Sequence, residues 1–177
     1  MSIISKAKNG DKEAFTMLIE EHKVCIYKTA LAIMKDEDDA CDAMQEALLS
    51  IYENLQSLKN DKYFKTWAIR IVINKCYHII NKKNLNNEKV AKARAEVEVN
   101  YFYEDNINKT EMEIALGKLD DDIRLVIVMY YYDGLATKDI AKILNIPKGT
   151  VQSRLQRGRE KLYHILEAEE VCDNVKE

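Results

Sequence analysis

Apolar residues recur at helical spacing along most of this chain, and no segment shows a convincing strand pattern. The first apolar stripe follows the turn formed by residues 9–11. It comprises Phe15, Leu18, Ile19, His22, Ile26, Ala30 and Ile33. This spacing predicts a long helix that is capped by Asp11 and ends near Lys35. The chain is therefore predicted to be all-α.

Two further helices are predicted in the first half of the chain. The acidic segment KDEDD at 35–39 supplies a cap and a negatively charged first turn for the second helix. Its apolar stripe comprises Ala40, Ala43, Met44, Ala47, Leu48, Ile51 and Leu55. After the loop-like segment SLKND at 57–61, a third helix is expected from Tyr63 to about Lys83, and it becomes polar and basic toward its end.

The helical pattern fails between residues 84 and 110, where the chain is polar and charged. A linker is the simplest interpretation, although VAKARAEV at 90–97 could form a turn or two of helix. Order returns at LDDDIRLVIVMYYYDGL, where aspartates precede an apolar stripe and Gly134 provides a stop. We therefore predict helical domains at 1–84 and 111–168, a flexible linker at 85–110 and an acidic tail at 169–177.

The segment TKDIAKILNIPKGTVQSRL at 137–155 has the pattern of a helix-turn-helix. Thr137 is expected to cap the first helix, and Asn145 is expected to take the left-handed conformation in the turn. Apolar residues such as Val151 and Leu155 would fix the second helix against the first. Hydroxyl, amide and guanidinium groups remain on the outer surface of the second helix, and such groups bind base edges and phosphates.

The distribution of charge supports a local DNA-binding patch. The formal net charge of −3 argues against a wholly basic nucleic-acid binder. Cations nevertheless gather in the helix-turn-helix and just after it, in a segment whose only acidic residues are Asp139 and Glu160. They are Lys138, Lys142, Lys148, Arg154, Arg157, Arg159 and Lys161. The alternative is a solvated helical surface whose cations only maintain solubility.

The sequence indicates neither a metal site nor a cofactor. No two of the four cysteines, at 25, 41, 76 and 172, form a CxxC pair. We therefore expect them to be reduced thiols in the cytoplasm. His22 and Cys25 could share one helical face, but two ligands do not complete a tetrahedral site, so we interpret them as a half-buried core pair.

An enzyme and a membrane protein are both disfavoured. The chain has no Gly-rich phosphate loop, no HExxH and no nucleophile motif, so no catalytic residue is proposed, and its three histidines, His22, His78 and His164, fall inside helical patterns. The apolar run LVIVMYYY at 125–132 is far shorter than a membrane helix, and no signal segment opens the chain, so no membrane insertion is expected.

Two separate motifs resemble those of the extracytoplasmic-function (ECF) sigma factors, group IV of the sigma-70 family of bacterial RNA polymerase subunits. YYYDGLATKDIAKILNIPKGTVQSRLQRGREKL at 130–162 resembles region 4, including its I-P-x-G-T-V-x-S-R-L core. DEDDACDAMQEALLSIY at 36–52 resembles the D-A-x-D-x-x-Q-E helix of region 2, and FKTWAIRIVINK at 64–75 resembles its F-x-x-W-x-x-x-I-x-x-N segment.

This resemblance implies three binding surfaces. The core polymerase, through its beta-prime clamp coiled coil, would bind Asp42, Gln45 and Glu46. The −10 element of the promoter would contact Asn74, Lys75, His78 and Lys82. The −35 element would contact Lys148, Thr150, Gln152, Ser153, Arg154 and Arg157.

The resemblance also implies the function. The protein would direct promoter-specific transcription initiation with core RNA polymerase, including its beta flap, while the polymerase performs the chemistry. A stress response controlled by an anti-sigma factor is expected, and a membrane-tethered one fits how this family usually works. The alternative function is a self-sufficient helix-turn-helix regulator, which would bind an operator tightly without polymerase.

Some positions depart from the family pattern. His78 stands where an aspartate is common, and Lys148 replaces a frequent glutamate, so both are expected to affect promoter choice. Asp120 follows Leu119 where the family often has proline, and the aspartates are expected to cap the helix instead. Gly158 replaces a frequent alanine at a cost of roughly 1 kcal/mol, and it is expected to loosen the end of the recognition helix. Trp67 could offer a stacking surface, but we favour a core position.

Overall fold

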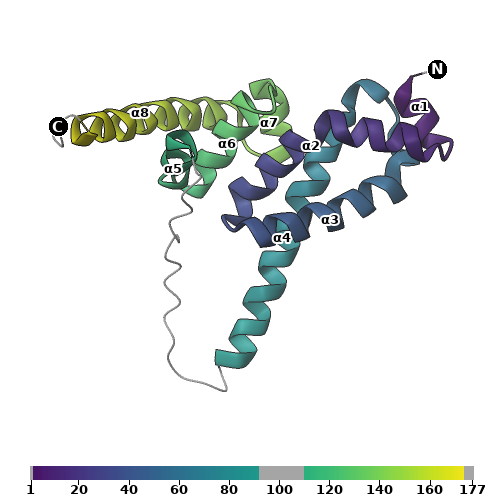
Figure 1. The fold of residues 1–177 in the computed structure, drawn as a ribbon, viewed down its shortest axis with the longest axis horizontal. Helices are drawn as coiled ribbons and strands as arrows, with labels where there is room; N and C mark the ends of the chain where they lie inside the picture. Colours follow the sequence, from purple (N-terminus) through teal and green to yellow (C-terminus); the bar gives the residue numbers. More distant parts are fainter. Residues whose placement is uncertain (1, 92–109, 174–177) are drawn as a thin grey trace.

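The computed structural model describes residues 2–91 and 110–173, and side chains at 2–85 and 110–168 (Figure 1). All regular elements in these ranges are helices, so the predicted all-α class is confirmed. No helix in these ranges is both long enough and apolar enough to cross a bilayer. Residues 92–109 of the predicted linker lie outside the described residues.

The first domain is a bundle in which α2, α3 and α4 pack against one another and α1 packs against α2. Its elements are α1 (Ile3–Lys8), α2 (Lys12–Met34), α3 (Glu37–Asn54), two short 3-10 turns (Leu55–Ser57 and Asp61–Tyr63) and α4 (Phe64–Ala91). Leu18, Ile26, Ile51, Phe64 and Val72 are fully buried at its centre.

The boundaries of α2 and α3 follow the predicted caps. The Asp11 carboxylate accepts a hydrogen bond from the Ala14 amide at 3.0 Å. Helix α2 ends where Lys35 takes the left-handed conformation at φ 66°. Asp36 then caps α3 by accepting from the Asp39 amide at 2.9 Å. These caps join residues three apart, which is why local sequence was sufficient to predict them.

The second domain packs α6 and α7 against the long helix α8, with α5 at the side. Its elements are α5 (Glu111–Gly117), α6 (Asp121–Tyr131), α7 (Thr137–Leu144) and α8 (Lys148–Asp173). A capping box joins Thr110 and Glu113 at the start of α5. The sequence carries this T-x-x-E signal, which our interpretation overlooked.

The helix-turn-helix forms as expected at its turn but not at its first cap. Asn145 is left-handed at φ 53° and ψ 46°, and the Ile146 amide donates to the Ala141 carbonyl at 3.0 Å. Helix α7, however, has Ala136 at its N-cap position, so Thr137 is its first residue and the predicted cap was wrong.

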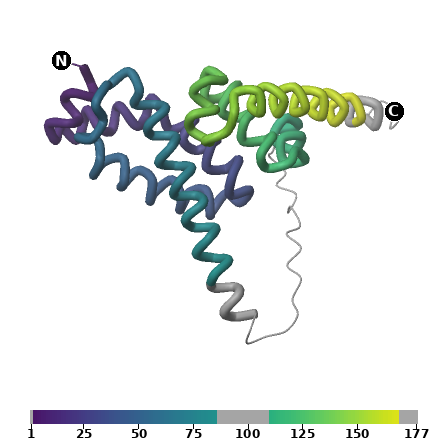
Figure 2. Tube along the Cα trace, turned by 180° about the vertical axis from the view of Figure 1, so that it is seen from behind, coloured from purple at the N-terminus to yellow at the C-terminus, as the bar shows by residue number. Residues whose placement is uncertain are grey.

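Helices α4 and α8 run to Ala91 and Asp173, beyond the predicted domain ends at residues 84 and 168. These domain bounds remain a prediction. Asp120 occupies the N-cap position of α6, but its carboxylate makes no cap bond and pairs instead with Lys161 at 2.5 Å. The second domain lies against the first through α6 on α2 and α7 on α4, while the far half of α4 projects beyond the bundle (Figures 1 and 2).

Gly158 lies where α8 crosses α6 closely. A Cβ atom at this position would lie 2.7 Å from Cγ1 of Ile127 and 2.9 Å from Cγ2 of Ile123. Our expectation that this glycine loosens α8 was therefore wrong, because it allows α8 to pack tightly on α6 within a helix that runs unbroken to Asp173.

We predict that Gly158→Ala destabilises the protein although alanine favours helix by about 1 kcal/mol. Overpacking a core costs about 1–3 kcal/mol, so after the gain in helix propensity the free energy of unfolding should fall by up to about 2 kcal/mol in denaturant titrations. Gly149→Ala is the matched control, since a methyl group there would meet no neighbouring atom within 4 Å. Equal unfolding midpoints for the two variants would contradict the proposed packing role.

Candidate nucleic-acid and polymerase-binding surfaces

The first three turns of α8 carry all six candidate −35 residues. Lys148, Gln152 and Arg157 are exposed, whereas Thr150, Ser153 and Arg154 are half-buried. Val151 and Leu155 point inward, as predicted, with exposed fractions of 0% and 3%. Helix α8 thus presents donors of several kinds while its apolar side is fixed against α6 and α7.

The arginines on this surface have partners within the protein. Arg154 forms an ion pair with Asp122 of α6, and Arg157 donates to the Ser153 hydroxyl at 3.2 Å. These contacts hold both guanidinium groups in place on the helix surface. Contact with a phosphate or base by Arg154 would therefore require exchange with the Asp122 carboxylate.

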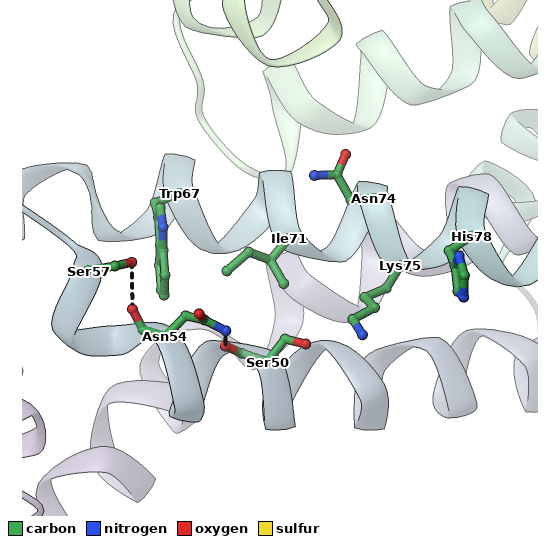
Figure 3. A pocket seen from close by; sticks show the side chains of 8 residues that line it. All are labelled: Ser50, Asn54, Ser57, Trp67, Ile71, Asn74, Lys75 and His78. Carbon is green, nitrogen blue, oxygen red and sulfur yellow. Dashed lines mark hydrogen bonds between the residues drawn. The ribbon is translucent and has the colours of Figure 1, made fainter.

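A hollow of about 500 Å³ lies between α3 and α4 (Figure 3). It brings together three of the four candidate −10 residues, Asn74, Lys75 and His78. The remaining candidate, Lys82, lies one turn farther along α4 and does not line the hollow. The other lining residues are Ser50, Asn54, Ser57, Trp67 and Ile71.

Trp67 takes part in both the core and the hollow. Its ring is half-buried, packs against the core and lies 6.1 Å from the Phe64 ring, centroid to centroid. The same side chain lines the hollow, where it points toward the end of α3 in Figure 3. The preferred core assignment is therefore incomplete, because the ring also offers surface to a ligand.

The candidate polymerase-binding residues lie on α3 beside this hollow. Asp42, Gln45 and Glu46 are all exposed, and their i, i+3, i+4 spacing places them on one helical face. The Glu46 carboxylate lies 3.8 Å from the Lys75 ammonium group. The acidic face of α3 and the basic edge of the hollow are thus neighbours.

His22 and Cys25 have partners that fit the core interpretation. Nδ1 of His22 is 2.9 Å from the Leu18 carbonyl oxygen, and its ring meets the Phe64 ring edge-on at 5.0 Å. The Cys25 thiol donates to the His22 carbonyl at 3.0 Å. Within residues 2–85 and 110–168, no group of three His, Cys, Asp or Glu side chains could hold a metal ion.

Arg124 and Asp133 are buried ionisable residues that our sequence interpretation did not select. Their exposed fractions are 4% and 1%. Both flank the apolar run at 125–132, which is a signal that could have drawn attention to them. Burial raises the pKa of Asp133 to about 6, although a hydrogen bond from Thr29 and the charge of Lys65 oppose this shift.

Both halves of the chain match families of known proteins. The family model of Sigma-70 region 2 matches residues 18–85, and that of Sigma-70 region 4 matches residues 111–162. The ECF RNA polymerase sigma factor SigW of Bacillus subtilis is 32% identical over 172 residues, covering 90% of this chain and 92% of SigW. The chain belongs to the ECF RNA polymerase sigma factors. The sigma-E factor of Escherichia coli K12 is 28% identical to this sigma factor over 173 residues, which cover 89% of this chain and 89% of that protein.

Solved structures agree with the fold of this sigma factor. CnrH, solved in complex with the cytosolic domain of CnrY, matches with a TM-score of 0.65 and 25% identity over 94% of this chain and 96% of CnrH. RpoE, solved with the anti-sigma factor NepR from Bartonella quintana, matches with a TM-score of 0.70 and 22% identity over 86% of this chain and 96% of RpoE.

We predict that thiol reagents at pH 8 modify Cys41, which is exposed next to Asp42, but spare Cys25 and Cys76. Burial raises the pKa of Cys76 to about 12 and also raises the pKa of Cys25, so neither thiolate is populated or accessible. Peptide mass mapping after brief maleimide treatment measures this selectivity, with the denatured chain as control. Equal modification of Cys41 and Cys76 in the native protein would contradict the described burial.

Proposed function

We propose that this sigma factor divides promoter recognition among three surfaces. The start of α8 binds the −35 element, the hollow between α3 and α4 binds the opened −10 element, and the acidic face of α3 binds the core polymerase. The beta-prime clamp coiled coil and the beta flap are the proposed contacts on the polymerase. The polymerase itself performs the chemistry, and the proposed location is the cytoplasm.

The observation that carries this proposal is the convergence of Asn74, Lys75 and His78 with Trp67 on one hollow. Promoter opening requires a place for an unpaired base and cations for the phosphates of its strand. Trp67 supplies an aromatic surface, Asn74 an amide and Lys75 a cation. A volume of about 500 Å³ lies within the range of roughly 300–1000 Å³ for small-ligand sites.

The contact between Glu46 and Lys75 suggests how polymerase binding could assist promoter opening. These two side chains are only 3.8 Å apart in the free protein, so the carboxylate competes with phosphates for the lysine. A cationic surface of the polymerase that binds Glu46 would remove this competition. Lys75 would then be available to the separated DNA strand.

The regulatory partner is a further part of the proposal. RpoE was solved with the anti-sigma factor NepR, and we propose an anti-sigma protein, tethered to the membrane, for this chain as well. A stress signal would release the sigma factor from it. The alternative of an autonomous operator-binding regulator has less support, because residues 18–85 match a region 2 domain rather than a sensing domain.

Transcription in vitro with core polymerase tests the function as a whole. Adding the protein should produce promoter-specific transcripts from genomic fragments, and the core alone should not. Absence of specific initiation on every fragment would overturn the proposal. Tight operator binding without polymerase would instead support the autonomous regulator.

We predict that replacing Arg154 and Arg157 with Ala weakens −35 recognition while core binding survives. Each guanidinium contact to DNA contributes about 1–3 kcal/mol, so holoenzyme affinity for promoter duplex should fall at least tenfold in a mobility-shift assay. Lys12→Ala is the control, because it removes an exposed cation at the start of α2, outside the three proposed binding surfaces. An equal loss of core binding would show that the surface is wrongly assigned.

We also predict that Trp67→Leu impairs opening of the −10 element, whereas Trp67→Phe retains much of it. Both replacements stay apolar toward the core, but only phenylalanine keeps a ring for stacking, which contributes about 1–3 kcal/mol per base. Permanganate reactivity of unpaired thymines in the holoenzyme complex should fall at least fivefold for Trp67→Leu. Equal opening by the two variants would exclude a stacking role for Trp67.

A further inference from the structure

Two buried polar contacts lie where the second domain packs against α2. Nε of Arg124 donates to the Ala32 carbonyl at 2.9 Å, near the C-terminal end of α2. One turn earlier, the Thr29 hydroxyl donates to Oδ2 of Asp133 at 2.8 Å. All three side chains that make these bonds are buried, with exposed fractions between 0% and 4%. The interface between the domains thus contains two ionisable groups from the second domain.

Contacts at the edge of the interface fix how the domains are aligned. Lys28 pairs with Glu113 at 2.5 Å, and Lys35 pairs with Asp121 at 2.8 Å. On α4, Nη2 of Arg70 donates to the Lys142 carbonyl of α7 at 2.6 Å. Partly exposed ion pairs contribute little to stability, so among the polar contacts the buried bonds matter most for docking.

The docked arrangement brings the candidate −10 and −35 surfaces close together. Arg70, which touches α7, lies one turn before Asn74 on α4. Burial, followed by the charges of Asp122 and Asp121, raises the pKa of Tyr77 on α4, and Arg154 of α8 is near enough to oppose this shift. The names of the two boxes place them about 25 base pairs apart, or roughly 85 Å of duplex. The domains must therefore separate before both surfaces can contact a promoter.

The Asp133 carboxyl is poorly accommodated when it is ionised in the docked state. Oδ2 accepts from Thr29, whereas Oδ1 is buried with no hydrogen-bond partner among the described residues. The positive charge of Lys65 on α4 lowers the pKa of Asp133 and so favours its ionisation. Cys25 of α2 also faces Asp133 but is neutral, and Lys28 of α2 lies over the adjacent ring of Tyr132. A buried carboxylate with one unpaired oxygen favours protonation.

We propose that Thr29 and Asp133 form a proton-responsive latch between the two domains. Protonation of Asp133 stabilises the docked arrangement, in which the promoter cannot be bound at both boxes. Ionisation weakens docking and favours the separated arrangement. The functional consequence rests on the proposed −10 and −35 surfaces, whereas the latch itself is a property of the free protein.

The direction of the pH dependence follows from the two states of Asp133. In the docked state its pKa is raised to about 6, and after separation the carboxyl is in water with an ordinary pKa near 4. The docked state therefore binds the proton more tightly and is strengthened as the pH falls below about 7. Between pH 7.5 and 5 the docking equilibrium constant should rise about tenfold.

Hydrogen exchange of the full-length chain tests the latch, with rates corrected for the intrinsic effect of pH. The opening constant for the contacting parts of α2 and α6 should be about tenfold smaller at pH 5 than at pH 7.5. Asp133→Asn keeps an acceptor for Thr29 without a charge, so its opening constant should be small and nearly independent of pH, because Glu113 and Asp121 in the other pairs between the domains have lowered pKa values and change charge mainly below pH 5. Thr29→Val removes the donor at nearly constant volume and should increase opening at both pH values.

Glu53→Gln is the matched control, since it neutralises an exposed carboxyl of α3 and should behave as the wild type does. Two results would overturn the latch: a wild-type opening constant that does not change with pH, or an Asp133→Asn variant that keeps the wild-type pH dependence. Because this readout needs neither polymerase nor promoter, failure of the latch leaves the transcription assay unaffected. Failure of transcription likewise leaves the exchange result standing.

Discussion

Helix α2 forms part of the core of the first domain and also the surface on which the second domain docks. The arrangement of the whole molecule depends on this double role. Leu18 and Ile26 are fully buried along the part of α2 that packs with α3 and α4. Near the C-terminal end of α2, the Thr29 hydroxyl donates to Asp133 of the second domain, and the Ala32 carbonyl accepts from Arg124. The caps at Asp11 and Lys35 fix the length of α2, so they also fix where the second domain can dock.

The chemistry of this shared surface suits the proposed separation of the domains. Buried apolar residues of the two domains form one continuous cluster, so opening costs hydrophobic free energy. Arg124 and Asp133 offset part of this cost, because both are ionisable and can be hydrated once the domains part. Buried polar pairs add little net stability compared with apolar packing but strongly disfavour misaligned docking. The interface can therefore be specific without being permanent.

The sequence predicted those features that depend on close neighbours along the chain. The caps at Asp11 and Asp36 and the left-handed Asn145 each involve residues within about one helical turn. The end of α4 was missed because that helix projects from the bundle and is exposed at 81–85, so no apolar stripe marks it. The latch joins residues 104 positions apart, and Gly158 meets a different helix, so neither could be derived from local spacing.

The pairing of cations on the candidate DNA surfaces explains why an acidic chain can carry them. Lys75 lies near Glu46, and Arg154 is paired with Asp122. Lys161 is likewise paired with Asp120. A phosphate must displace these carboxylates, so nonspecific DNA gains less from each cation than it would from a free one. Under the proposed assignment, promoter binding would depend on contacts that displace several carboxylates together, and a polymerase that occupies the acidic face of α3 would favour this exchange at Lys75. The affinity for DNA would thus be coupled to assembly with the polymerase rather than set by the net charge of −3.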